Sequence, residues 1–331
     1  MANPVLVEVT RGNRVESIHR GAIAVSDSTG VLRMALGDID AVVYPRSSLK
    51  PVQALALFET GAAAQFRLSP EEIALACASH SGEPQHTSRI AAWQARIGCS
   101  ADDLACGAHK PLHEPTANAM IARGEKWTPL HNNCSGKHTG FMTVARALNA
   151  PVKGYELPDH PVQQLVARIF SEMSDVPGPL PYGIDGCTVP NFAVPLRALA
   201  FAMARIAAPE NLPPDRRVAC RTIFDAMTQH PDLVAGSGRA CTLLMRENAQ
   251  IAVKTGAEGV FVAIIPAVGL GVALKCDDGA TRAAETAIAA TLIALGAVPD
   301  EGSAHSLAHA NVLDTRGRPA GSRRFVGTLR G

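Results

Sequence analysis

The arrangement of strand-like and helix-like segments constrains the fold of this chain more than any other feature. Apolar stretches typical of strands gather near both ends, and helical patterns fill the middle. The strand patterns lie at residues 4–10, 18–26, 31–36, 250–254, 260–266 and 269–275. A doubly wound sheet would need regular alternation of strands and helices, which is missing. We therefore predict an α+β fold with an antiparallel sheet built from both ends of the chain.

The boundaries of these regions follow from turn and cap signals. We assign the sheet to about residues 4–36 and 250–276 and the helical region to about residues 45–247, within one domain over residues 1–331. Helical patterns fall at residues 50–59, 70–77, 86–97, 115–123, 138–148, 160–174, 192–207, 214–228, 239–247 and 280–295. Ser69 before Pro70 predicts a capped helix start, and turn signals at 27–30 and 256–259 predict hairpins.

The composition excludes several classes of protein. The 331 residues are 47% hydrophobic and 18% charged with a net charge of +1, which indicates a soluble globular protein and gives no case for nucleic-acid binding. No apolar segment is long enough to span a bilayer, and the first eight residues lack the pattern of a secretory signal. We expect a cytoplasmic protein whose eight cysteines stay mostly reduced, without a disulfide framework or paired CxxC zinc site.

Ser47 and Lys50 form a possible nucleophile and base. Residues three apart share one face of a helix, and Pro51 is tolerated only in the first turn, so the helix should begin near Ser47 or Ser48. The serine hydroxyl would then lie at the positive end of the helix, where a developing oxyanion is stabilised. The alternative is a capping serine beside a solvated lysine, because this spacing also occurs by chance.

Two further segments carry polar groups in positions that suit chemistry. Ser79 lies in the loop Ala78–Glu83 directly after an apolar helix, where the alternative is an ordinary helix end capped at Gly82. Lys254 lies in the strand segment Lys254–Gly256, where burial of a lysine would be costly without a role. The alternative for Lys254 is an edge-strand lysine that prevents aggregation.

Together these three segments resemble the motifs of serine β-lactamases and penicillin-binding proteins. The order Ser-x-x-Lys, loop serine, Lys-Thr-Gly and the sheet made from both ends agree with that resemblance. The middle motif departs from it, because Ser79–Glu83 reads SHSGE where Ser-Asp-Asn would be expected. This difference argues against a penicillin-recognising enzyme.

A longer set of blocks resembles one family, the Rhizobium etli-type L-asparaginases of the asparaginase II family. The segment His131–Met142, with the sequence HNNCSGKHTGFM, is similar to the family signature, as are Ser47–Pro51, Ala78–Glu83 and Asp185–Pro190. The blocks keep the family's order over roughly the whole chain. The resemblance implies a fold similar to that of serine β-lactamases and glutaminases.

The resemblance also implies a set of site residues. It pairs Ser47 with Lys50 and Ser79 with Lys254 as two Ser–Lys tandems. It further implies a Zn²⁺ site, used to hold substrate rather than to drive chemistry, whose ligands would be Cys134, Lys137 and Cys187. Residue types alone would not predict that site, because zinc prefers Cys, His and carboxylates and a lysine ligand must lose its proton.

We expect Ser47, deprotonated by Lys50, to attack the side-chain amide of L-asparagine, with Ser79 and Lys254 passing a proton to the ammonia. Lysines converging on one cavity would lower the pKa of the base. The candidates for binding the zwitterionic substrate are Arg46 or Lys137 for the carboxylate, Asp185 and Glu83 for the ammonium group, His138 for the carboxylate or a metal ligand, and Cys241 as a pocket residue.

Three other functions stay open on the sequence alone. Glutamine differs from asparagine by one methylene, worth only about 1–3 kcal/mol in a pocket, so glutaminase activity is the nearest alternative. Hydrolysis of β-lactams by the same fold is a second. A non-catalytic sensor of amino acids or metal is the third, although a sensor has no need of two nucleophile–base pairs. The resemblance also implies a homodimer, and no organic cofactor is expected.

Overall fold

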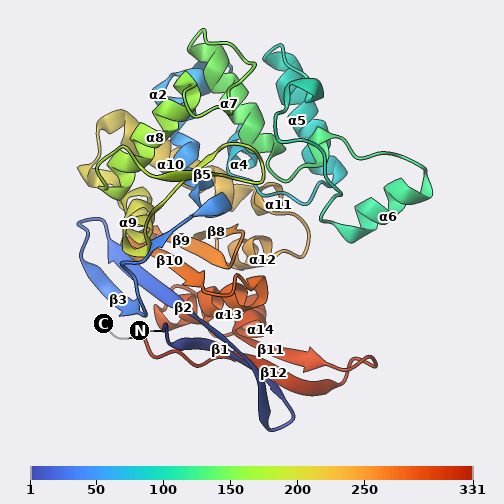
Figure 1. Cartoon of the computed structure of the whole chain (residues 1–331), viewed down its shortest axis with the longest axis vertical. Coiled ribbons are helices and arrows are strands. Elements are labelled where there is room, and N and C mark those ends of the chain that lie inside the picture. The colour runs from blue at the N-terminus through green and yellow to red at the C-terminus, as the bar shows by residue number, and fades with distance from the viewer. Residues whose placement is uncertain (1, 330–331) are drawn as a thin grey trace. The chain divides into compact units, whose positions relative to one another are not determined.

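The computed structural model describes residues 2–329, which divide into two compact units. Unit 1 contains the described residues up to Ser48, the segment Val194–Asn211 and the chain from Leu243 onward. Unit 2 contains Leu49–Ala193 and Leu212–Thr242. Figure 1 labels many of the elements of both units, and each unit is described here by itself.

Unit 1 is built on one eight-stranded antiparallel sheet. Its strands are β1 (Val5–Arg11), β2 (Arg14–Asp27), β3 (Leu32–Leu36), β8 (Ala252–Gly256), β9 (Val260–Ile265), β10 (Leu270–Cys276), β11 (His309–Leu313) and β12 (Pro319–Phe325). The strand order is β11-β12-β1-β2-β10-β9-β8, with β3 also paired to β2. Strands from both ends of the chain thus meet at β2 and β10, which pair from Gly21 to Asp27, and the predicted α+β architecture is confirmed.

Two predicted turns connect strands of this sheet. Asp27 Oδ1 accepts the backbone N–H of Thr29 at 2.9 Å, and Gly30 has a φ of +88°. The second turn joins β8 to β9 through Glu258 and Gly259, both with positive φ. Asp and Asn favour turns because their side chains accept backbone N–H groups, and Gly favours them because it adopts positive φ readily. The positions of these residues in the sequence therefore fix the hairpin register.

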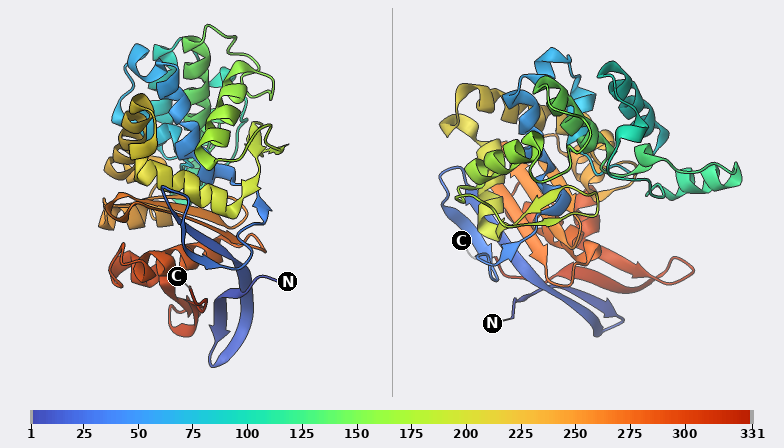
Figure 2. Two further views of the ribbon diagram at one scale, coloured as in Figure 1. Left: turned by 90° about the vertical axis from the view of Figure 1, so that its left-hand side faces the viewer. Right: turned by 45° about the horizontal axis from the view of Figure 1, so that its top comes forward.

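Helices α9 (Leu196–Ala207) and α13 (Thr281–Ala294) cover opposite faces of this sheet, as Figure 2 shows. At Gly271 the backbone of β10 lies directly against α9: a Cβ there would be 2.1 Å from the N atom of Ala204. Helix α14 (Gly302–Ala308) packs on α13. The small elements of this unit are β4 (Val42–Val43), paired with β7 (Val194–Pro195), and the 3₁₀ turns η4 (Pro209–Asn211) and η5 (Pro266–Val268).

Unit 2 is almost entirely helical. Its helices are α1 (Lys50–Gln53), α2 (Leu55–Glu59), α3 (Ala62–Gln65), α4 (Pro70–Ala76), α5 (Pro84–Arg96), α6 (Glu114–Ala122), α7 (Ser135–Ala147), α8 (Pro161–Ser174), α10 (Pro214–Gln229) and α11 (Pro231–Val234). It also contains the 3₁₀ turns η2 (Ala101–Asp103) and η3 (Pro129–His131) and the hairpin of β5 (Tyr182–Ile184) with β6 (Pro190–Phe192). Two elements have residues in both units: η1 (Arg46–Leu49) and α12 (Ala240–Glu247).

The close approach of α4 and α7 organises the part of unit 2 that carries the predicted motifs. A Cβ at Gly136 would lie 2.2 Å from the carbonyl oxygen of Leu75, so only glycine allows this packing. As a result the end of α4 and the start of α7, with the residues Ser79 and Cys134 next to them, lie side by side. A capping box between Ser69 and Glu72 fixes the other end of α4, as the sequence predicts.

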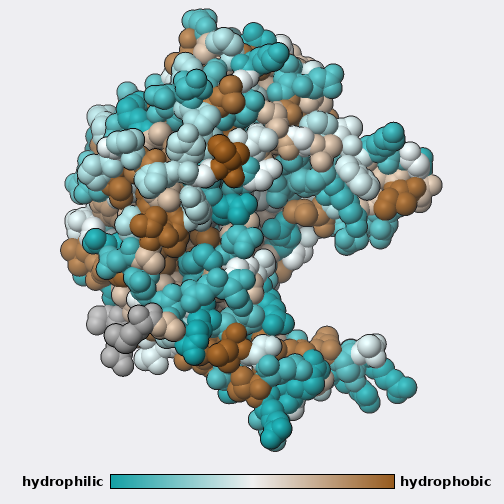
Figure 3. Space-filling view, viewed as in Figure 1, coloured by the Kyte–Doolittle hydropathy of each residue, from teal (hydrophilic) through white to brown (hydrophobic). Residues whose placement is uncertain are grey.

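The structure differs from the predicted elements at a few places. The helix expected at residues 50–59 is preceded by the 3₁₀ turn η1 and divided at Ala54 into α1 and α2. Pro51 lies in the first turn of α1, as expected. Pro195 shortens the helix expected at residues 192–207, which begins at Leu196. The hairpin β11–β12 was not predicted; its tip, at the lower right of Figure 3, is mostly hydrophilic.

Within residues 2–329, no helix combines the length and the apolar character that a membrane span requires.

Candidate active site

A buried lysine links three elements of unit 2. Lys50, at the start of α1 and 1% exposed, donates hydrogen bonds to Ser79 Oγ at 3.1 Å and to Cys134 Sγ at 3.1 Å. It also donates to the carbonyl oxygen of Ala78. These three contacts satisfy the buried amine of Lys50. The structure therefore places the lysine of the first predicted motif within proton-transfer distance of the serine of the second.

The loop that carries Ser79 is held rigidly in unit 2. The backbone N–H of Ser79 donates to the carbonyl of Val234 at 2.9 Å. The ring of His80 contacts Ser135 Oγ at 2.8 Å and accepts the Gly82 N–H at 3.1 Å. Burial is the main reason why the pKa of His80 lies well below its ordinary value, and the neighbouring His86 and Lys50 lower it further. A neutral imidazole thus positions this loop. His80 lies inside the sequence motif, but the motif alone does not reveal this role.

Cys134, Lys137 and Cys187 come together in unit 2, as the resemblance implies. Lys137 Nζ donates to Cys187 Sγ at 2.9 Å. The hydrogen bond from Cys187, together with the nearby Lys50 and Lys137, lowers the pKa of Cys134 well below that of a free thiol. Burial alone would lower the pKa of Lys137, but the charge of the Cys187 and Cys134 pair raises it to about 12. The lowered pKa of Cys134 and the raised pKa of Lys137 favour opposite charges on these two neighbouring groups.

These donor atoms suit a borderline-soft divalent cation. Two sulfur atoms and one amine nitrogen lie close together, and Zn²⁺ binds sulfur at about 2.3 Å and nitrogen at about 2.0–2.1 Å. Lys137 would have to give up a proton before its nitrogen could bind the metal. The residues thus fit the implied metal on condition that binding displaces that proton.

His138 and Asp185 both lie against Cys187. The Tyr155 hydroxyl forms a hydrogen bond with His138 Nδ1 at 2.6 Å and accepts the Ala105 N–H at 2.9 Å. The ring of His138 also faces the backbone of Cys187. Asp185 Oδ1 accepts the Cys187 N–H at 3.4 Å. Burial is the main reason why the pKa of His138 lies well below its ordinary value, and the nearby charge of Lys137 lowers it further. The two roles predicted for His138, binding of the substrate carboxylate and orientation of a metal ligand, remain predictions.

Glu83 holds a loop together in unit 2. Its carboxylate accepts the backbone N–H of Ser237 at 2.8 Å and the Ser237 hydroxyl at 2.9 Å. Gly236 has a φ of +111°, and a Cβ there would lie 2.6 Å from Glu83 Oε1. This contact ties the start of α5 to the segment before α12. Cys241 lies buried in α12 itself. The substrate contacts predicted for Glu83 and Cys241 remain predictions.

Unit 1 carries Arg46, Ser47 and Lys254. Ser47 is half-buried in η1, and Arg46 before it has a φ of +54°. Lys254 is 1% exposed although β8 is the edge strand of the sheet, so it does not serve as a solvent-facing edge lysine. A Cβ at Gly256 would lie 2.6 Å from the carbonyl oxygen of Pro45. The third motif thus packs against the start of the first within one unit.

Comparisons with known proteins found one family and several similar solved structures. The model of the L-asparaginase II family matches residues 7–325 of the chain. No curated protein matches the chain. Similar solved structures include a β-lactamase from Mycobacterium bovis, at 15% identity and a TM-score of 0.42, with 84% of this chain and 95% of that chain covered. Another is the protein Mglu in its native form, at 16% identity and a TM-score of 0.38, with 84% of this chain and 65% of that chain covered.

Proposed function

Because the chain belongs to the L-asparaginase II family and is therefore an asparaginase-type amidohydrolase, we propose that it converts L-asparagine to L-aspartate and ammonia through a serine ester. The observation that carries this mechanism is the buried contact of Lys50 Nζ with Ser79 Oγ at 3.1 Å. A lysine in hydrogen-bond contact with a serine is the arrangement that proton transfer from a hydroxyl requires.

In the proposed reaction, Ser47 Oγ attacks the amide carbon and its proton passes to Lys50. The carbon–nitrogen bond then breaks, and a proton delivered through Ser79 and Lys254 leaves with ammonia. Water attacks the aspartyl ester by the same route and restores the serine. Backbone N–H groups at this helix start would stabilise the oxyanion.

The contact of Lys50 with Ser79 also supports a second assignment of the nucleophile. Lys50 would then remove the proton of Ser79, and Ser79 would form the ester. Both assignments share the same base and the same products. They differ only in which serine carries the acyl group.

Substrate binding in this proposal uses one acidic side chain, one basic side chain and the proposed metal. Asp185 would accept the α-ammonium group, and Arg46 would bind the α-carboxylate through its guanidinium. Cys134, Lys137 and Cys187 would hold a zinc ion, which when bound supplies positive charge for substrate binding. Removal of metal should therefore raise KM for L-asparagine and leave kcat nearly unchanged. Kinetics before and after chelation, followed by zinc readdition, would measure this.

A trapping experiment distinguishes the two nucleophiles. Denatured samples quenched during turnover should carry the mass of one aspartyl group on a single serine peptide. The Ser47→Ala variant should lose both the adduct and turnover, whereas Ser48→Ala, which removes only a hydrogen bond to the Pro45 carbonyl, should keep both. An adduct that persists in Ser47→Ala and disappears in Ser79→Ala would move the nucleophile to Ser79.

The same assay tests the alternative functions. Turnover of L-glutamine or a β-lactam at a kcat/KM above that of L-asparagine would replace the proposed substrate. Binding of L-asparagine without release of ammonia would identify a sensor that keeps the fold. In that case Ser47→Ala would leave the affinity unchanged.

A further inference from the structure

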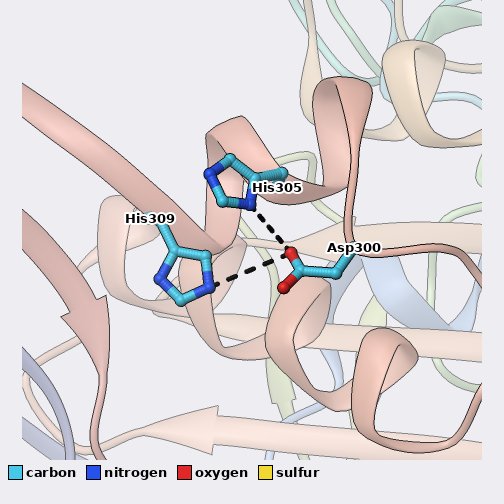
Figure 4. A group of neighbouring side chains, drawn as sticks. All are labelled: Asp300, His305 and His309. Carbon is cyan, nitrogen blue, oxygen red and sulfur yellow. Dashed lines mark hydrogen bonds and ion pairs between the residues drawn. The ribbon is translucent and has the colours of Figure 1, made fainter.

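A second cluster of metal-binding side chains lies in unit 1, on residues that neither the family blocks nor the proposed reaction use. Asp300, His305 and His309 are exposed, and one ligand atom from each lies within 4.8 Å of the others. Among residues 2–329, these form the only group of at least three His, Cys, Asp or Glu side chains that meets this spacing. Figure 4 shows the two rings and the carboxylate pointing toward one another.

The fold places these side chains on one side of α14. His305 lies in α14, His309 is the C-cap residue that follows its last turn, and Asp300 lies just before the N-cap residue Glu301. His305 Nδ1 lies 2.9 Å from Asp300 Oδ1, and His309 Nε2 lies 4.0 Å from the same oxygen. The ring centroids are 4.8 Å apart.

Contacts at both ends hold this helix in place. The carboxylate of Glu247 accepts the Ser303 N–H at 2.8 Å and the Ser303 hydroxyl at 2.5 Å. At the other end, Thr286 Oγ1 on α13 donates to the carbonyl of Leu307 at 2.8 Å. A metal site on this helix would therefore need only side-chain rotations, with little cost in backbone order.

The chemistry of the cluster selects a class of ion. Zinc binds imidazole nitrogen at about 2.0–2.1 Å and carboxylate oxygen at about 2.0–2.2 Å, so neighbouring tetrahedral ligands lie about 3.3 Å apart. The observed separations of 2.9 and 4.0 Å lie on either side of that value. Two imidazoles and one carboxylate suit zinc, nickel or copper, whereas calcium and magnesium prefer oxygen alone.

A simple His–Asp pair elsewhere in unit 1 shows what the cluster adds. His19 Nδ1 lies 2.5 Å from Asp278 Oδ2, but its other nitrogen accepts the Arg282 Nε–H at 3.1 Å. Both ring nitrogens of His19 are therefore engaged in hydrogen bonds within the protein. The cluster at α14 instead brings a second histidine to the same carboxylate oxygen, which a structural hydrogen bond does not require.

We propose that Asp300, His305 and His309 form a binding site for a divalent transition-metal ion of the zinc, nickel and copper class. The ion would join the segment before α14 to His309, the first residue of β11. Because β11 is an edge strand of the sheet, the ion would stabilise that edge. This site is separate from the residues proposed for amide hydrolysis.

Calorimetric titration of the tag-free, chelator-treated, full-length protein with zinc tests the proposal. The protein should bind one more equivalent of zinc than the variant His305→Ala/His309→Ala. Asp300→Asn keeps the side-chain size and should lower the affinity for that additional zinc ion by at least about tenfold. Even changes to residues outside the ligand shell lower metal affinity about 10–100-fold. His113→Ala, which removes a histidine outside the cluster, should bind as the unchanged protein does.

Cobalt(II) separates this site from the cysteine site, because only thiolate ligation gives intense near-ultraviolet charge-transfer absorption. The histidine variant should lose one equivalent of cobalt without losing that absorption. Equal stoichiometry in the unchanged protein and the histidine variant would overturn the proposal. If the double variant does not fold, two other results together would overturn the proposal. The Asp300→Asn variant would bind zinc with unchanged affinity, and zinc would not shift the imidazole proton NMR signals of His305 and His309.

Discussion

At the scale of single residues, the candidate site depends on a lysine that is fully enclosed and fully hydrogen-bonded. Lys50 contacts Ser79, the Ala78 carbonyl and Cys134 within unit 2. A buried amine is costly unless it is hydrogen-bonded, and these three acceptors provide those hydrogen bonds. The sequence motif predicted a lysine near a serine, but its contact with Cys134 could not be predicted, because it depends on how α1 packs beside the start of α7.

Gly236 gives a residue-scale prediction. Its φ is +111°, and a Cβ would lie 2.0 Å from Ser81 Oγ, so Gly236→Ala must move the Ser79 loop or the Glu83 contact. Backbone strain and overpacking then add, and we expect a loss of more than about 3 kcal/mol in the free energy of unfolding. Urea denaturation measures this loss.

Gly124→Ala is the matched control for that substitution. Gly124 also has a positive φ, +67°, but a Cβ there would have no neighbour within 4 Å. It should cost only the backbone strain of about 1–2 kcal/mol. Equal losses in the two variants would show that the contact with Ser81 does not matter.

At the scale of elements, the sequence predicted the sheet and most helices because periodicity and capping are local signals. The capping box at Ser69 and the turn at Asp27 are examples in which side-chain hydrogen bonds determine where a helix begins or a chain turns. The strands β11 and β12 were missed because their burial is only partial and β12 pairs with a strand at the other end of the chain. Pairing over such distances leaves little local trace.

The cap of α4 gives an element-scale prediction. Ser69→Ala removes the acceptor for the Glu72 N–H and should lower the free energy of unfolding by about 1 kcal/mol. Ser88→Ala, in the exposed interior of α5, should change it by no more than a few tenths of a kcal/mol. Urea midpoints of both variants measure the difference, and an equal effect would contradict the role of the cap.

At the scale of the whole molecule, buried histidines predict how stability depends on pH. Burial lowers the pKa values of His80, His86 and His138 below the ordinary value of 6.5. The unfolded chain therefore binds more protons as the pH falls below about 6.5, and stability should fall with it. The Glu83 carboxylate does not interfere in this pH range, because its pKa is lowered from 4.5.

The slope of unfolding free energy between about pH 6.5 and pH 5.5 measures this effect. Each histidine that stays neutral in the folded protein contributes up to about 1.4 kcal/mol per pH unit. His86→Asn should reduce the slope by up to that amount, because asparagine does not take up a proton. A flat profile in the unchanged protein would contradict the neutral state of these histidines.

The family match covers almost the whole molecule, so the reaction class follows from it, whereas the roles of individual residues are proposals. The measurement that tests the account most directly is ammonia release from L-asparagine by the unchanged protein, Lys50→Met and Lys153→Met. We predict that Lys50→Met lowers kcat by at least about 100-fold, as expected for loss of a general base, and that the exposed Lys153 can be replaced without effect. A Lys50→Met variant that folds and keeps its kcat would contradict the proposed Ser–Lys mechanism.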